Sequence, residues 1–293
     1  MKSRHFSRIA IKVALGGVIF FLWARAYQHL FFEGPYRAFF VDQSLFGGVQ
    51  NLISDLSWLE FVTDPRTDRA ILFYTRSMGG LWLLTPLLFL GYRKVSSPVL
   101  WVSASVSSLG FMFYGASDYL DKGYQLAQWL EYAAQIVMPV WVVFLLQKGP
   151  SGSLLFVGKV AIALTFLGHG LYAMGFFPVP GHFIYMTTDI LSLSDDGARQ
   201  FLLIAGVLDL VAVVALFFPK VDHWALAYCV LWGFFTALAR PVAYIEPGPV
   251  FWISVHQSVY EFFVRIPHFI LPLCTLWLAL GQTRMSRKTV QTA

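Results

Sequence analysis

The residues in this chain that could do chemistry are ionisable side chains within long apolar segments. Near the C-terminus, Glu261, Arg265 and His268 follow one another at spacings of four and three residues. On an α-helix this spacing places the three side chains on one face. An ionisable face within an apolar helix must turn toward the protein interior or a water-filled cavity. The spacing therefore predicts a polar stripe that binds a ligand and exchanges protons with it.

Further polar residues lie toward the same end of other apolar segments. We expect them to join the stripe in lining one polar pocket that opens on the outer side of the protein. With the stripe, these candidate ligand-binding residues are Arg25, Arg76, Glu131, Gln135, His169, Asp209 and Arg240.

The same residues allow a purely structural interpretation, in which opposite charges neutralise one another and fix the register of the helices. Both interpretations stay open at this level. The expected structural pairs are Glu261 with Arg265 or Arg240, Arg76 with Glu131, and His169 with Asp209.

Histidines raise the question of a cofactor. His29, His169, His256 and His268 lie at similar depth and could offer two axial ligands to a haem, and His169, Asp209 and His268 could hold a metal. The chain has no CxxCH, HExxH or paired CxxC spacing, however. We therefore expect no metal site, disfavour a haem, and favour a quinone as the lipid-soluble ligand.

The segments that carry these residues are long and apolar. Hydrophobic residues make up 57% of the 293 residues and charged residues 13%, against about 25% charged in soluble domains, which excludes an ordinary soluble protein. A membrane helix needs about 20 apolar residues. Eight segments meet this requirement, at 12–32, 70–92, 97–117, 126–147, 156–177, 199–219, 223–244 and 257–281.

Charge alternates between the connections, as the positive-inside rule requires. With both termini in the cytoplasm, twelve of the 21 basic residues lie in inner segments, where Asp222 is the only acid. The net charge of +5 thus reports topology and predicts no nucleic-acid partner. We expect an all-α multi-pass protein of a cell membrane, the bacterial inner membrane, in contact with lipid. The inner basic residues are Lys2, Arg4, Arg8, Lys12, Arg93, Lys94, Lys148, Lys159, Lys220, Arg284, Arg287 and Lys288.

The two halves of the chain resemble each other. AYQHLFFEGPYRAFF (26–40) aligns with LYAMGFFPVPGHFIY (171–185), pairing Pro35 with Pro180. AAQIVMPVW (133–141) aligns with IPHFILPLC (266–274), pairing Pro139 with Pro272. Because both halves begin on the same side, we predict two parallel four-helix units, 1–148 and 149–293.

The outer loop 33–69 is the longest connection. Its apolar residues recur at helical spacing, which predicts an amphipathic helix that lies on the outer membrane surface or covers the pocket. A loop helix that simply packs on the bundle is the alternative. The apolar residues are Leu45, Val49, Leu52, Ile53, Leu56 and Leu59.

A family resemblance lies in the second half. LGHGLYAMGF, a Pro/Gly segment and then FLLIAGVLDLVAVVALFF resemble the first two helices of the DoxX-like membrane family, whose Gly-x-x-acid pattern is matched by Gly206 and Asp209. The first half departs from it, because TRSMGGLWLL carries Arg76 and no acid. The resemblance implies a tandem of small helical bundles and a role in quinone-linked redox systems or as a maturation accessory. In distant relatives it implies carboxylation chemistry.

These observations lead to one favoured function and two alternatives. The favoured function is an outward-facing site for a lipid-soluble ligand such as a quinone, in a redox-associated system with a redox or accessory membrane subunit as partner. The first alternative is a non-catalytic accessory or assembly protein whose buried charges only hold the bundle together. The second is a small-solute or proton-coupled transporter.

Overall fold

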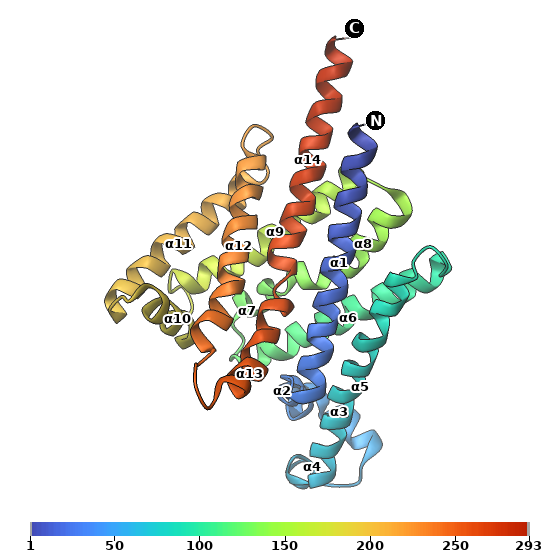
Figure 1. The fold of residues 1–293 in the computed structure, drawn as a ribbon. Helices are drawn as coiled ribbons and strands as arrows, with labels where there is room; N and C mark the ends of the chain where they lie inside the picture. Colours follow the sequence, from blue (N-terminus) through green and yellow to red (C-terminus); the bar gives the residue numbers. More distant parts are fainter. Residues whose placement is uncertain (1, 292–293) are drawn as a thin grey trace.

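Helices form every regular element in residues 2–291, the part of the chain that the computed structural model describes (Figure 1). Side chains are described for residues 9–281, so the predicted inner charges Lys2, Arg4, Arg8, Arg284, Arg287 and Lys288 lie outside them. The longer helices are α1 (Lys2–Phe31), α5 (Pro65–Leu90), α6 (Ser97–Asp121), α8 (Ala133–Lys148), α9 (Gly152–Ala173), α11 (Asp195–Ala215), α12 (Asp222–Tyr244) and α14 (Pro267–Gln291). The shorter ones are α2 (Tyr36–Phe40), α3 (Gln43–Ile53), α4 (Trp58–Thr63), α7 (Leu126–Glu131), α10 (Gly181–Leu191) and α13 (Phe251–Val264).

Seven helical segments in the described part are long and apolar enough to cross a membrane, which supports a multi-pass membrane protein. α5 covers the predicted span 70–92 and has 26 residues, but it is not one of the seven. Arg76 and its polar neighbours Thr75 and Ser77 make its middle less apolar than the other spans. The seven segments are Ile9–Phe31, Ser97–Asp121, Leu126–Lys148, Gly152–Ala173, Asp195–Ala215, Asp222–Tyr244 and Phe251–Gly281.

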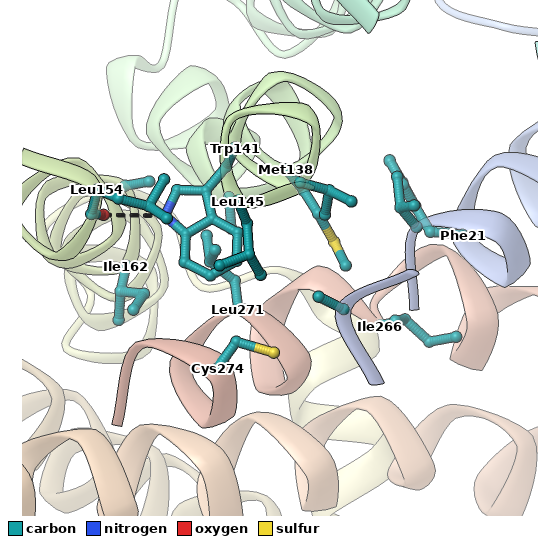
Figure 2. Packing of buried hydrophobic residues seen from close by; sticks show 14 of the residues in the cluster. Phe21, Met138, Trp141, Leu145, Leu154, Ile162, Ile266, Leu271 and Cys274 are labelled. Carbon is teal, nitrogen blue, oxygen red and sulfur yellow. Dashed lines mark hydrogen bonds between the residues drawn. The ribbon is translucent and has the colours of Figure 1, made fainter. Parts of the chain in front are cut away.

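The apolar core lies where the two halves of the chain meet. Trp141 of α8 donates its indole N–H to the carbonyl oxygen of Leu154 of α9 at 2.9 Å, and Phe21 of α1 and Leu271 of α14 belong to the same cluster (Figure 2). Large apolar side chains that are exposed on α5, α6, α11 and α12 face outward instead. Such a surface suits lipid better than water.

Two of the predicted spans are broken helices. The span 126–147 consists of α7 and α8, which meet at Tyr132, and the span 257–281 consists of α13 and α14, which meet at Arg265 and Ile266. Pro267 has no N–H to donate, and it stands at the first position of α14, where a helix tolerates proline best. The prediction that Glu261, Arg265 and His268 lie on one continuous helix is therefore wrong.

The corresponding parts of the two halves have similar local structure. Pro35 directly precedes α2 and Pro180 directly precedes α10, while Pro139 and Pro272 lie inside α8 and α14. The neighbours also correspond: α1 packs on α5 as α9 packs on α11, and α6 packs on α8 as α12 packs on α14.

The long connection 33–69 forms three short helices, α2, α3 and α4. Asp42 accepts hydrogen bonds from the first backbone N–H groups of α3, and Ser57 and Glu60 form a capping box on α4. The turn between them divides the single amphipathic helix that the pattern predicted. α3 and α4 lie at the end of the bundle opposite to both termini (Figure 1).

Candidate functional site

A polar cavity of about 210 Å³ lies beside the two helix breaks. Side chains from both halves of the chain line it, and they include eight of the ten candidate residues. These are Arg25, Glu131, Gln135, His169, Arg240, Glu261, Arg265 and His268.

The other two candidates do not line this cavity. Arg76 donates to backbone carbonyl oxygens at the end of α1, those of His29 and, at 3.1 Å, Phe32. Asp209 is buried and accepts a hydrogen bond of 2.7 Å from the hydroxyl of Tyr228. The expected ion pairs of Arg76 with Glu131 and of His169 with Asp209 are therefore not formed, because each partner has a closer neighbour.

On one side of the cavity, a single carboxylate forms ion pairs with two guanidinium groups. Glu261 Oε2 lies 3.0 Å from a terminal nitrogen of Arg240 and 3.3 Å from one of Arg265. Arg265 also donates to the backbone oxygen of Glu261 at 3.1 Å, a carbonyl near the end of α13. Both pairings expected for Glu261 are thus present.

His182, on α10, completes this side of the cavity. Another terminal nitrogen of Arg240 lies 3.1 Å from His182 Nε2. Two causes lower the pKa of His182. The larger is its burial away from water, and the second is the positive charge of the neighbouring Arg240. His182 therefore stays neutral and can accept a hydrogen bond from Arg240.

The two remaining candidate histidines meet at Glu131. His169 Nδ1 lies 2.9 Å from Glu131 Oε1, and His268 Nε2 lies 3.4 Å from the Glu131 backbone oxygen at the end of α7. The rings of His169 and His268 stand edge to face, with centroids 5.3 Å apart. Backbone groups freed by the helix break are thus used by side chains of the site, as a low-dielectric environment requires.

Arg25 of α1 reaches the cavity from the first half. It donates to the amide oxygens of Gln135, at 3.1 Å from Nε, and of Gln28, at 2.6 Å. Its guanidinium group also lies over the rings of Tyr114 and Tyr132, at 4.5 and 5.5 Å from their centroids. These contacts hold the guanidinium plane in a fixed orientation.

The cavity also holds polar residues that were not among the candidates, and they include His182 and the group formed by Asp118, Gln128 and Tyr132. Asp118 Oδ2 accepts hydrogen bonds of 2.7 Å from both Gln128 and Tyr132, and all three residues line the cavity. Gln128 and Tyr132 could have been predicted from the internal repeat of the sequence. The alignment that pairs Pro139 with Pro272 also pairs Gln128 with Glu261, Tyr132 with Arg265 and Gln135 with His268.

A second, mostly apolar cavity of about 480 Å³ adjoins the first. Phe166, Phe201, Trp232 and Phe235 are among its walls, and Asp209 also lines it. The two cavities share five lining residues, which are His169, Phe183, Arg240, Arg265 and His268.

Of the four histidines that suggested a haem, His169 and His268 lie together in the cavity, whereas His29 and His256 lie elsewhere. His29 is buried between the Arg25 carbonyl oxygen, at 2.8 Å, and the Tyr36 hydroxyl, at 2.9 Å, and His256 contacts the Tyr27 hydroxyl. Among the residues that the structure describes, no three His, Cys, Asp or Glu side chains form a group that could hold a metal.

Fold and site together define a multi-pass helical membrane protein with a polar cavity at two broken helices. Comparisons of the chain with family models, with curated proteins and with solved structures found no match.

Proposed function

We propose that this protein binds an amphipathic, lipid-soluble ligand, with the ligand's head group in the polar cavity and its apolar part in the adjoining cavity. The observation that carries the proposal is the set of five residues shared by the two cavities. A quinone, which has a polar ring and an isoprenoid tail, belongs to this class of ligand.

The sizes and linings of the cavities support this division. Ligand pockets usually measure about 300–1,000 Å³ and are mostly apolar, with a few polar groups that fix orientation. The larger cavity has about 480 Å³ and aromatic walls. The smaller one, of about 210 Å³, matches a head group rather than a whole lipid.

The rim of the apolar cavity supports entry from the bilayer. Leu191, Phe235 and Val242 line this cavity and are also exposed on the outer surface of the bundle. A ligand that partitions into lipid would reach the site sideways, between α10 and α12, without passing through water.

The proposal includes a topology. We propose that α5 is an eighth span, that 1–148 and 149–293 are parallel repeats of a DoxX-like unit, and that both termini are in the cytoplasm of a bacterial inner membrane. The exposed Leu72, Phe73 and Leu84 of α5 support the eighth span. The equivalent helix neighbours in the two halves support the repeat.

Lipid extraction and mass spectrometry of the purified protein test the proposed function. We expect a stoichiometric lipid-soluble molecule in the native protein and its loss in Ala205→Phe, because Ala205 is buried and lines the apolar cavity. Val211→Phe is the matched control, since Val211 is exposed on the same helix.

Whether the ligand is a quinone is tested separately by measuring how tightly a ubiquinone analogue binds to His268→Ala and Arg265→Ala. Affinity that both variants lose supports a quinone as the ligand. If the native protein carries no lipid-soluble molecule and Arg265→Ala lowers only its stability, the buried charges are structural and the accessory role replaces the proposal.

A further inference from the structure

The charge distribution of the polar cavity bears on the chemical class of the head group. Arg25 is 3% exposed. Its guanidinium group donates to the neutral amides of Gln28 and Gln135 and lies against the neutral side chains of Tyr114 and Tyr132. It forms no ion pair with any described carboxylate. A buried guanidinium group without an anionic partner loses hydration that neutral amides replace only in part.

The other arginines of the cavity are also short of negative charge. Arg240 and Arg265 share the single carboxylate of Glu261, and the buried Nε of Arg240 has no hydrogen-bond partner. Arg265 lines the same cavity as Arg240 and Arg25. Arg240 and Arg265 therefore share one carboxylate, and Arg25 has no ion pair with any described carboxylate.

The two remaining acids of the cavity do not pair with these arginines. Glu131 Oε1 lies 2.9 Å from His169 Nδ1 but does not accept a hydrogen bond. Asp118 accepts hydrogen bonds from Gln128 and Tyr132, and Lys122 lines the same cavity. Neither acid forms an ion pair with Arg25, Arg240 or Arg265 in the described structure.

We infer that the head group of the ligand is an anion, the carboxylate or phosphate group of a lipid, which contacts Arg25, Arg240 and Arg265. This inference rests on the proposed function and narrows its ligand class. Guanidinium groups bind carboxylate and phosphate oxygens in charge-assisted, often bidentate hydrogen bonds. The carbonyl groups of a quinone accept hydrogen bonds but leave the positive charge uncompensated.

Direct binding to the full-length protein in detergent tests the inference. Four of the probes have the same 18-carbon tail. Oleate and 1-oleoyl lysophosphatidate are anionic, whereas oleyl alcohol and monoolein are neutral. A short-chain ubiquinone analogue is the fifth probe. We expect the dissociation constant of at least one anionic probe to be lower than those of the neutral probes by about tenfold or more. Comparing oleate with lysophosphatidate distinguishes a carboxylate from a phosphate head group.

Two variants connect this preference to Arg25. Arg25→Gln should remove most of the preference for anions, whereas Arg199→Gln, at an exposed arginine, should leave it unchanged. Gln135→Glu is a second test that keeps Arg25, and it applies if the Arg25→Gln variant does not fold. It places a carboxylate where an amide oxygen now accepts from Arg25, and it should raise thermal stability while weakening anion binding.

The outcomes separate the inference from the function on which it rests. Equal affinity for anionic and neutral probes, or a preference that Gln135→Glu leaves unchanged, overturns the anionic head group while the lipid site stands. If none of the five probes binds, the proposed function itself fails.

Discussion

At the scale of single residues, Glu261 is the carboxylate that forms ion pairs with two arginines of the site. Its Oε2 lies within 3.3 Å of terminal nitrogens from both Arg240 and Arg265. Removing one partner of a partly buried ion pair costs more than the pair itself contributes, because the other charge remains out of water. Here two charges would remain.

Glu261→Gln should therefore destabilise the protein, by about 3 kcal/mol. Unfolding followed by circular dichroism in detergent measures this loss. Asp195→Asn, which removes the exposed partner of Arg199, is the control and should cost less than about 1 kcal/mol. Equal losses in the two variants would show that Arg240 and Arg265 do not depend on Glu261.

Most of the charged site residues could be predicted from the sequence, because an ionisable group within an apolar segment is conspicuous. The uncharged residues that contact them could not be predicted in this way. Tyr132 and Gln128 carry no charge and are common at membrane interfaces, so their role appears only through their alignment with Arg265 and Glu261. The partners of Arg76 were unpredictable for another reason, since backbone carbonyl oxygens at a helix end leave no trace in residue type.

At the scale of elements, the site depends on close contact between α12 and α14. A Cβ atom on Gly233 of α12 would lie 2.4 Å from the backbone oxygen of His268, much closer than such atoms can approach. The absence of a side chain at Gly233 thus sets the position of the first turn of α14, which carries His268 into both cavities.

Gly233→Ala should push the two helices apart, and we expect a loss of about 2 kcal/mol in stability together with weaker ligand binding. Gly16→Ala is the control, because a Cβ atom at Gly16 meets nothing within 4 Å. Thermal unfolding and lipid binding of the two variants measure the difference. Unchanged values for Gly233→Ala would show that α14 can move without consequence for the site.

The short helices α3 and α4 present a second feature at this scale. All six residues of the predicted apolar stripe are exposed, and Leu52 and Leu59 are the most exposed, at 85% and 72%. A soluble surface would not leave such a stripe uncovered. Its placement at one end of the bundle (Figure 1) suits a helix that lies at the membrane interface.

We predict that a nitroxide label on Leu52→Cys in liposomes contacts lipid-soluble oxygen more than a water-soluble nickel chelate. The same label on Asn51→Cys of α3, which lies off the apolar stripe, should show the opposite preference. Both native cysteines are buried, so labelling is directed to the introduced one. A water-exposed label at Leu52 would mean that α3 does not lie in the membrane interface.

The two helix breaks differ in how well the sequence predicts them. Pro267 stands at the first position of α14, but Pro139 and Pro272 lie inside helices, so a proline alone does not identify the break. The break at Tyr132 has no proline or glycine beside it. There, Ala134 N–H donates to Thr165 Oγ1 of α9 at 2.9 Å, so a tertiary contact, rather than the local sequence, compensates the break.

At the scale of the whole molecule, topology depends on α5. The helix has 26 residues and packs along α1, but the polar residues in its middle lower its hydropathy. Length and composition alone therefore leave it in doubt. Contacts with the end of α1 lower the free-energy cost of placing α5 in the bilayer, because Arg76 donates to backbone carbonyl oxygens there instead of facing lipid.

If α5 crosses the membrane, the number of spans is even and both termini lie on the same side. Fusions of green fluorescent protein and of alkaline phosphatase to each terminus in bacterial cells measure this directly. We expect both fluorescent fusions to be bright and both phosphatase fusions to be inactive, because basic residues such as Lys12, Lys94 and Lys148 favour the cytoplasmic side of a membrane. Active phosphatase at one terminus alone would mean an odd number of spans, with α5 lying outside the bilayer and the two halves inserted in opposite directions.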